Sequence, residues 1–169
     1  MNIVTTPVDV FFSNLISVSM EQKQVSLSPH VEEYVIELVS GLSSAAHTMS
    51  TRPAFINDLL RKGLSSGGSM RIEYLRLTGD VALFISGIFP DSLDSRRVFF
   101  TLGDFIDIGQ TAYGNMNIGT FDELAAEFPK VVEALNAVSV EIKLTCGGLE
   151  SYTTRRRLVD GRITRRSDG

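Results

Sequence analysis

Asp80 is the side chain in this sequence with the clearest capacity for chemistry, because it precedes an almost wholly apolar run, residues 81–89. A buried carboxylate is unfavourable unless hydrogen bonds or an opposite charge compensate it. If this segment is a helix, Arg76 lies one turn before Asp80, and Gly79 beside it permits close approach of another helix. We therefore predict that Asp80 is a structural anchor, satisfied by Arg76 or by the N–H groups at the start of a neighbouring helix. The alternative is that Asp80 is a catalytic base or a metal ligand.

Asp107 and Tyr113 belong to a second polar group, on a segment that also carries Asp104. Carboxylates spaced by about one helical turn can bind a hard divalent cation. The same spacing is typical of a solvated helix face, where the helix dipole favours acids near the N-terminus, and we predict this simpler arrangement. A small-ligand or divalent-metal-dependent enzyme would instead need Asp80, Asp107 and Tyr113 to meet in one pocket.

Arg155, Arg156 and Arg157 form a basic run towards the end of the sequence. Residues 151–169 contain six arginines and two aspartates, whereas residues 1–150 contain 10 Lys or Arg and 18 Asp or Glu. Arginine clusters can contact phosphate groups, so nucleic-acid binding is a further alternative. The run lacks interleaved aromatic residues apart from one tyrosine, and basic clusters are weak motifs by themselves. We expect a solvated terminal helix or a tail that docks on the acidic body, and we regard nucleic acid as an unlikely partner.

Few residues in the sequence could bind a metal or act as a nucleophile. Two histidines, His30 and His47, and one cysteine, Cys146, are too few for a usual zinc cluster. No neighbouring base would activate Cys146 as a nucleophile, and no glycine motif for phosphate binding is present. We therefore predict no metal, no cofactor and no catalytic residue. A single cysteine fits a reducing cytoplasm, and no apolar stretch reaches the roughly 18 to 20 residues that span a bilayer, so we expect a cytoplasmic protein outside the membrane.

The hydrophobic periodicity predicts an all-α fold, a single-domain multi-helix bundle. Apolar residues recur at intervals of three and four along most of the chain. Residues 70–89 are predicted to form the buried central helix, because their second half is apolar on all sides. Gly63 is predicted to end the preceding helix, Thr101 to cap a later one, and Pro129 to kink or restart the last one.

The length and charge distribution predict the domain organisation. A chain of 169 residues suits one domain. We expect residues 1–150 to form this helical domain and residues 151–169 to form a basic C-terminal helix or tail, partly disordered. Residues 138–145 are ambiguous, since every second residue from Val138 to Leu144 is apolar, as in a strand.

Four segments of the sequence carry a resemblance to known proteins. They are Glu33-Tyr34-Val35-x-x-Leu38-Val39, Arg71-x-x-Tyr74-Leu75-Arg76-x-x-Gly79-Asp80-x-Ala82-Leu83-Phe84-x-Ser86-Gly87-x-Phe89-Pro90, Ile106-Asp107-Ile108-Gly109-x-x-Ala112-Tyr113 and Phe121-x-Glu123-Leu124-Ala125-x-x-Phe128-Pro129. Together they resemble a family of small bacterial helical proteins with no assigned activity. The resemblance implies one helical domain in which residues 138–160 are helical, and it implies no catalytic residue. Phe99, Phe100 and Phe105 stand where the family pattern has tyrosines, which argues against a tyrosine hydroxyl acting near Asp107.

These observations favour a function in binding over a function in catalysis. The sequence offers no convergent catalytic set, and 43% of its residues are hydrophobic, which is enough to leave an apolar interaction patch. The leading hypothesis is a cytoplasmic helical module for protein–protein interaction or regulation, without catalysis. Its partner would be another protein or a second copy of the chain.

Overall fold

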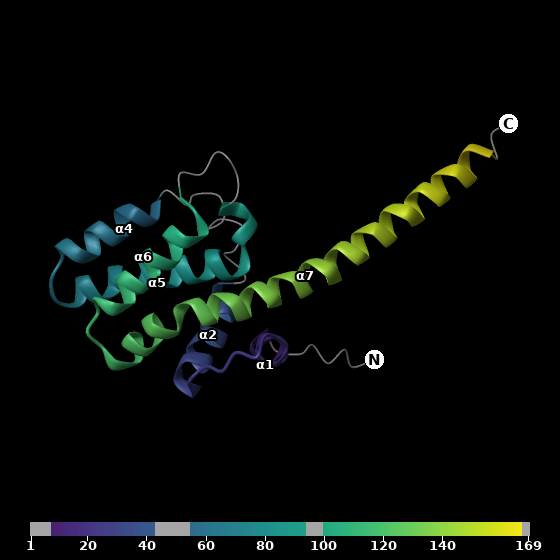
Figure 1. The fold of residues 1–169 in the computed structure, drawn as a ribbon. Helices are drawn as coiled ribbons and strands as arrows, with labels where there is room; N and C mark the ends of the chain where they lie inside the picture. Colours follow the sequence, from purple (N-terminus) through teal and green to yellow (C-terminus); the bar gives the residue numbers. More distant parts are fainter. Residues whose placement is uncertain (1–7, 43–54, 94–99, 167–169) are drawn as a thin grey trace. The chain divides into compact units, whose positions relative to one another are not determined.

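Helices make up all the regular structure of the residues that the computed structural model describes, 8–42, 55–93 and 100–166 (Figure 1). Beyond Ile142 only the backbone is described. The elements are α1 (Val8–Lys23), α2 (Pro29–Leu42), α4 (Phe55–Ser65), α5 (Gly68–Ile88), the 3-10 turn η1 (Pro90–Leu93), α6 (Leu102–Gly114) and α7 (Gly119–Arg166). The predicted all-α bundle is confirmed.

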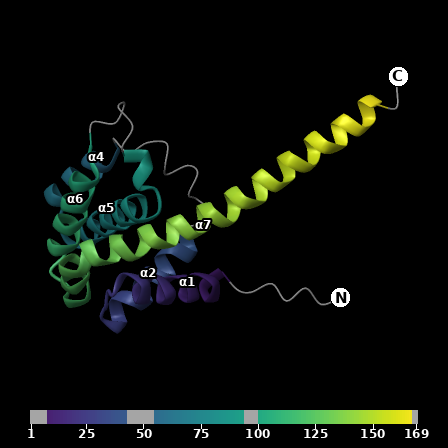
Figure 2. The same cartoon turned by 45° about the vertical axis from the view of Figure 1, so that its right-hand side comes forward.

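Helix α5 is the central element of the bundle. It packs chiefly against α4 and α6, and it also contacts α2 and η1. Figure 2 shows α4, α5 and α6 alongside one another. Every residue of α5 from Ala82 to Ile88 is buried, because neighbouring elements cover this half of the helix on all sides. The predicted central helix at residues 70–89 is therefore confirmed, with observed bounds of 68–88.

Gly63 has a different role from the predicted one. It lies inside α4, which continues to Ser65, and it is buried. A Cβ atom at this position would come within 2.7 Å of Cδ2 of Leu75. Glycine therefore lets α4 and α5 pack closely, and the prediction that it ends the helix is wrong because a packing role and a capping role favour the same residue type.

The predicted cap at Thr101 is confirmed by reciprocal hydrogen bonds. The Thr101 hydroxyl accepts a bond from the backbone N–H of Asp104 at 3.2 Å, and the Thr101 N–H donates to Oδ2 of Asp104 at 2.7 Å. The bonds from the Thr101 backbone and side chain hold the pKa of the Asp104 carboxyl below its ordinary value. This capping box starts α6, which carries part of the site described below.

Helix α7 decides two points that the sequence left open, whether the helix restarts at Pro129 and whether residues 138–145 form a strand. It runs through Pro129 without restarting, and it includes residues 138–145, where the alternating pattern had allowed a strand. Phe128 and Val132, on either side of the proline, are both buried. Their packing compensates for the backbone hydrogen bond that proline removes. The helical alternative for residues 138–145 is therefore correct.

The contacts divide the chain into two units, Met1–Val138 and Ser139–Gly169. The largest fully buried side chains of the first unit include four aromatic residues, Tyr113, Phe84, Phe105 and Phe128. Across the described ranges, none of the helices combines the length and apolar character needed to cross a membrane.

Candidate functional site

Asp80 joins three helices through two tyrosine hydroxyls. Its Oδ1 atom, on α5, accepts a hydrogen bond from the hydroxyl of Tyr34 on α2 at 2.6 Å. The same atom accepts one from the hydroxyl of Tyr113 on α6 at 2.7 Å. Both bonds have the short length, about 2.5–2.7 Å, of hydroxyl donors facing an ionised oxygen. We call Tyr34, Asp80 and Tyr113 the tyrosine–aspartate cluster.

Two phenylalanines of α7 line the cluster. The ring centre of Phe121 lies 5.3 Å from that of Tyr34 and 5.5 Å from that of Tyr113. The ring centre of Phe128 lies 5.9 Å from that of Tyr113. These separations fall in the range of about 4.5–7 Å that favourable aromatic pairs adopt. The hydrogen bonds of the cluster therefore lie in an apolar setting, where each is electrostatically stronger than in water.

Gly79 explains how Tyr113 reaches the carboxylate beside it. A Cβ atom at Gly79 would overlap the ring of Tyr113, which is completely buried. Only glycine leaves space for this ring against α5. The Gly79–Asp80 pair therefore acts as a unit, because the glycine admits the tyrosine ring and the aspartate accepts its hydroxyl.

Burial controls the protonation of the cluster. It raises the pKa of Asp80 above its ordinary value of 3.8, against the opposing effects of the two tyrosine hydrogen bonds and the Arg76 charge. Burial also raises the pKa of Tyr34 and of Tyr113, and the nearby Asp80 charge adds to both increases. Both tyrosines therefore keep their protons at neutral pH and act as hydrogen-bond donors. This arrangement suits a link between helices better than a base or a nucleophile.

Arg76 is not the direct partner that the sequence spacing suggested for Asp80. It is exposed on α5, and among the described residues no ion pair joins it to the carboxylate. The two bonds to Asp80 also come from side-chain hydroxyls and not from the N–H groups of a helix start. The sequence suggested Arg76 because it lies one turn before Asp80 on the same helix, although an arginine that precedes an aspartate is the less favourable order for such an ion pair. The observed donors come from other helices.

Asp107 lies apart from the cluster that contains Asp80 and Tyr113. It is exposed on α6, and within the described part of the chain no hydrogen bond links it to either residue. Phe105, one of the phenylalanines noted beside this segment, is fully buried. The structure thus brings together two of the residues named for the enzyme alternative and leaves the third in solvent. Among the described residues, no group of three or more His, Cys, Asp or Glu side chains could hold a metal ion.

Three of the predicted positions fall outside the described side chains. Arg155, Arg156 and Arg157 lie within α7, where only the backbone is described. Their suggested contacts with phosphate therefore stay predictions.

Tyr34 is the member of the cluster that sequence reasoning did not single out. Its spacing from Val31, Val35 and Leu38 marks it only as one more position on the apolar face of a helix. It is 46 residues from Asp80 in the sequence. No local pattern connects them, and only the packing of α2 near α5 does so.

A second polar link joins the start of α2 to α7. The backbone N–H of Ser28 donates to Oε2 of Glu127 at 3.1 Å, and its hydroxyl lies 3.3 Å from carboxylate oxygens of Glu123 and Glu127. A carboxylate at this place satisfies a donor at the helix start and interacts favourably with the helix dipole. Glu127 thus caps α2 from a distant part of the chain.

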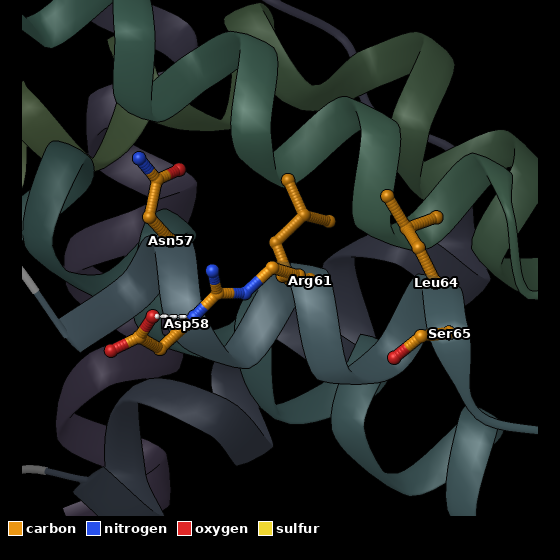
Figure 3. A pocket seen from close by; sticks show the side chains of 6 residues that line it. Asn57, Asp58, Arg61, Leu64 and Ser65 are labelled. Carbon is orange, nitrogen blue, oxygen red and sulfur yellow. Dashed lines mark hydrogen bonds and ion pairs between the residues drawn. The ribbon is translucent and has the colours of Figure 1, made fainter.

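Two surface hollows lie away from the tyrosine–aspartate cluster. One, of about 630 Å³, is lined by six residues of α4. Asp58 and Arg61 form an ion pair of 2.7 Å there, which Figure 3 marks with a dashed line. The other, of about 360 Å³, is formed by α1 and α2. Its lining residues are Asp9, Pro29, Glu32, Glu33, Ile36 and Glu37. Asp80 lines neither hollow.

Comparison with known proteins gives no relative from which a function could be transferred. No family model matches the chain, and neither a curated protein nor a solved structure matches it significantly. The function must therefore be inferred from the described residues themselves.

Proposed function

We propose that this chain is a cytoplasmic helical module that acts by binding another protein or a second copy of itself, without catalysis of its own. The cluster around Asp80 supports this proposal in one respect. Both tyrosine hydroxyls are occupied by the carboxylate, and their raised pKa values keep them protonated. The group with the clearest capacity for chemistry is thus used to join helices.

An apolar stripe on α5 is the observation that carries the proposal. Met70, Tyr74, Leu77 and Val81 follow one another at intervals of four, three and four, so they share a face of the helix. Met70 is 56% exposed and Leu77 is 40% exposed, and the other two are half-buried. We call these four residues the α5 stripe.

The α5 stripe is unusual for its place in the fold. The same helix is buried on all sides further along, from Ala82 to Ile88, whereas this first part leaves apolar side chains in water. Covering apolar surface is favourable by roughly 25 cal/mol per Å². Contiguous exposed apolar side chains are typical of protein-binding surfaces, while single ones are not informative.

Site-specific crosslinking tests the proposed function in cells. A photo-crosslinking amino acid at Leu77 should form a covalent adduct with a protein partner or with a second copy of the chain. The same amino acid at Asp107, an exposed position on α6, serves as the matched control and should form no such adduct. Leu77→Glu should weaken the association without unfolding the chain, because Leu77 is not part of the core. The absence of any adduct from both Leu77 and Met70 would overturn the proposal.

A further inference from the structure

We draw no further inference here: the strongest candidate, the hollow between α1 and α2 that four carboxylates line, is a cluster of surface acids, and nothing in the described part of the chain identifies a ligand for it.

Discussion

Carboxylates have opposite surroundings in two regions of this molecule, the tyrosine–aspartate cluster and the hollow between α1 and α2 that Glu33 and Glu37 help to line. Asp80 lies among aromatic rings and receives two hydroxyl hydrogen bonds. Glu33 and Glu37 are exposed and have no hydrogen-bond or ion-pair partner in the described residues. The comparison teaches that the prominence of a carboxylate in the sequence does not show whether it is available for binding. Asp80 stands out in the sequence but already accepts two hydrogen bonds.

The largest expected effect comes from removing the acceptor at the centre of the cluster. Asp80→Leu leaves the buried hydroxyl of Tyr113 and the half-buried hydroxyl of Tyr34 without their partner, so the free energy of unfolding should fall by about 2–5 kcal/mol. Asp80→Asn is the matched control, because its side-chain oxygen can still accept both bonds. Denaturant unfolding measures the two variants, and equal stabilities would show that the hydrogen bonds contribute little.

Removing one tyrosine hydroxyl at a time should show which of the two hydrogen bonds to Asp80 contributes more to the free energy of unfolding. Tyr113→Phe should lower the free energy of unfolding by about 1.5–3 kcal/mol, since it deletes one hydrogen bond to a charged group in a fully buried position. Tyr34→Phe should have a smaller effect, because water can replace the donor at a half-buried position. A larger loss for Tyr34 than for Tyr113 in equilibrium unfolding would reverse this ranking.

The close packing of Tyr113 against Gly79 should contribute almost as much to the stability of the fold as the hydrogen bonds to Asp80. Gly79→Ala places a methyl group into the ring of Tyr113 and should destabilise the fold by about 1–3 kcal/mol. Gly41→Ala, on α2, has no atom within 4 Å of the added methyl group and should instead stabilise the helix by up to about 1 kcal/mol. Thermal unfolding of both variants checks the prediction, which fails if both substitutions act in the same direction.

The raised pKa of Asp80 predicts a pH dependence of stability with a definite sign. At pH values just above 3.8, the unfolded chain has released the proton of Asp80 while the folded chain still holds it. The contribution of Asp80 to the free energy of unfolding should therefore fall as the pH rises through this interval. The difference between the native sequence and Asp80→Asn, measured by denaturant unfolding at several pH values, isolates this contribution. A difference that rises with pH would mean that hydrogen bonding outweighs burial.

The smallest effect on stability should come from Glu33 and Glu37 on α2. Glu33→Gln with Glu37→Gln should change the free energy of unfolding by less than about 0.5 kcal/mol, with a slight gain because like charges one turn apart are removed. Equilibrium unfolding at low salt provides the measurement. A large loss of stability would show that these acids have a structural role and that the contrast with Asp80 is false.

Much of the fold could be predicted because its signals are local. The periodicity of apolar residues identified the central helix, and the Thr101 and Asp104 types and spacing identified a helix start that the structure confirms. Gly63 was misassigned because the sequence could not show that Leu75 packs against it. Local signals therefore located the helices but not the contacts between them.

The candidate site was only partly predictable because its members come from different helices. Asp80 and Tyr113 were named from the sequence, but the bond between them depends on how α5 and α6 pack. Arg76 has the right sequence distance for a partner and yet is exposed, whereas Tyr34 is 46 residues away and makes the shorter bond. Sequence spacing reports neighbours on one helix, and this site depends on neighbours between helices.

The cap that Glu127 supplies to α2 has a consequence for the order of folding. Ser28 and Glu127 are 99 residues apart in the sequence. At a synthesis rate of roughly 5–20 residues per second, α2 emerges on the order of 5 to 20 s before its capping residue has been made. During that interval the apolar face of α2, which includes Val31, Val35 and Val39, lacks its final environment. We therefore expect the first two helices of this chain to reach their final packing late and to bind a chaperone early during translation.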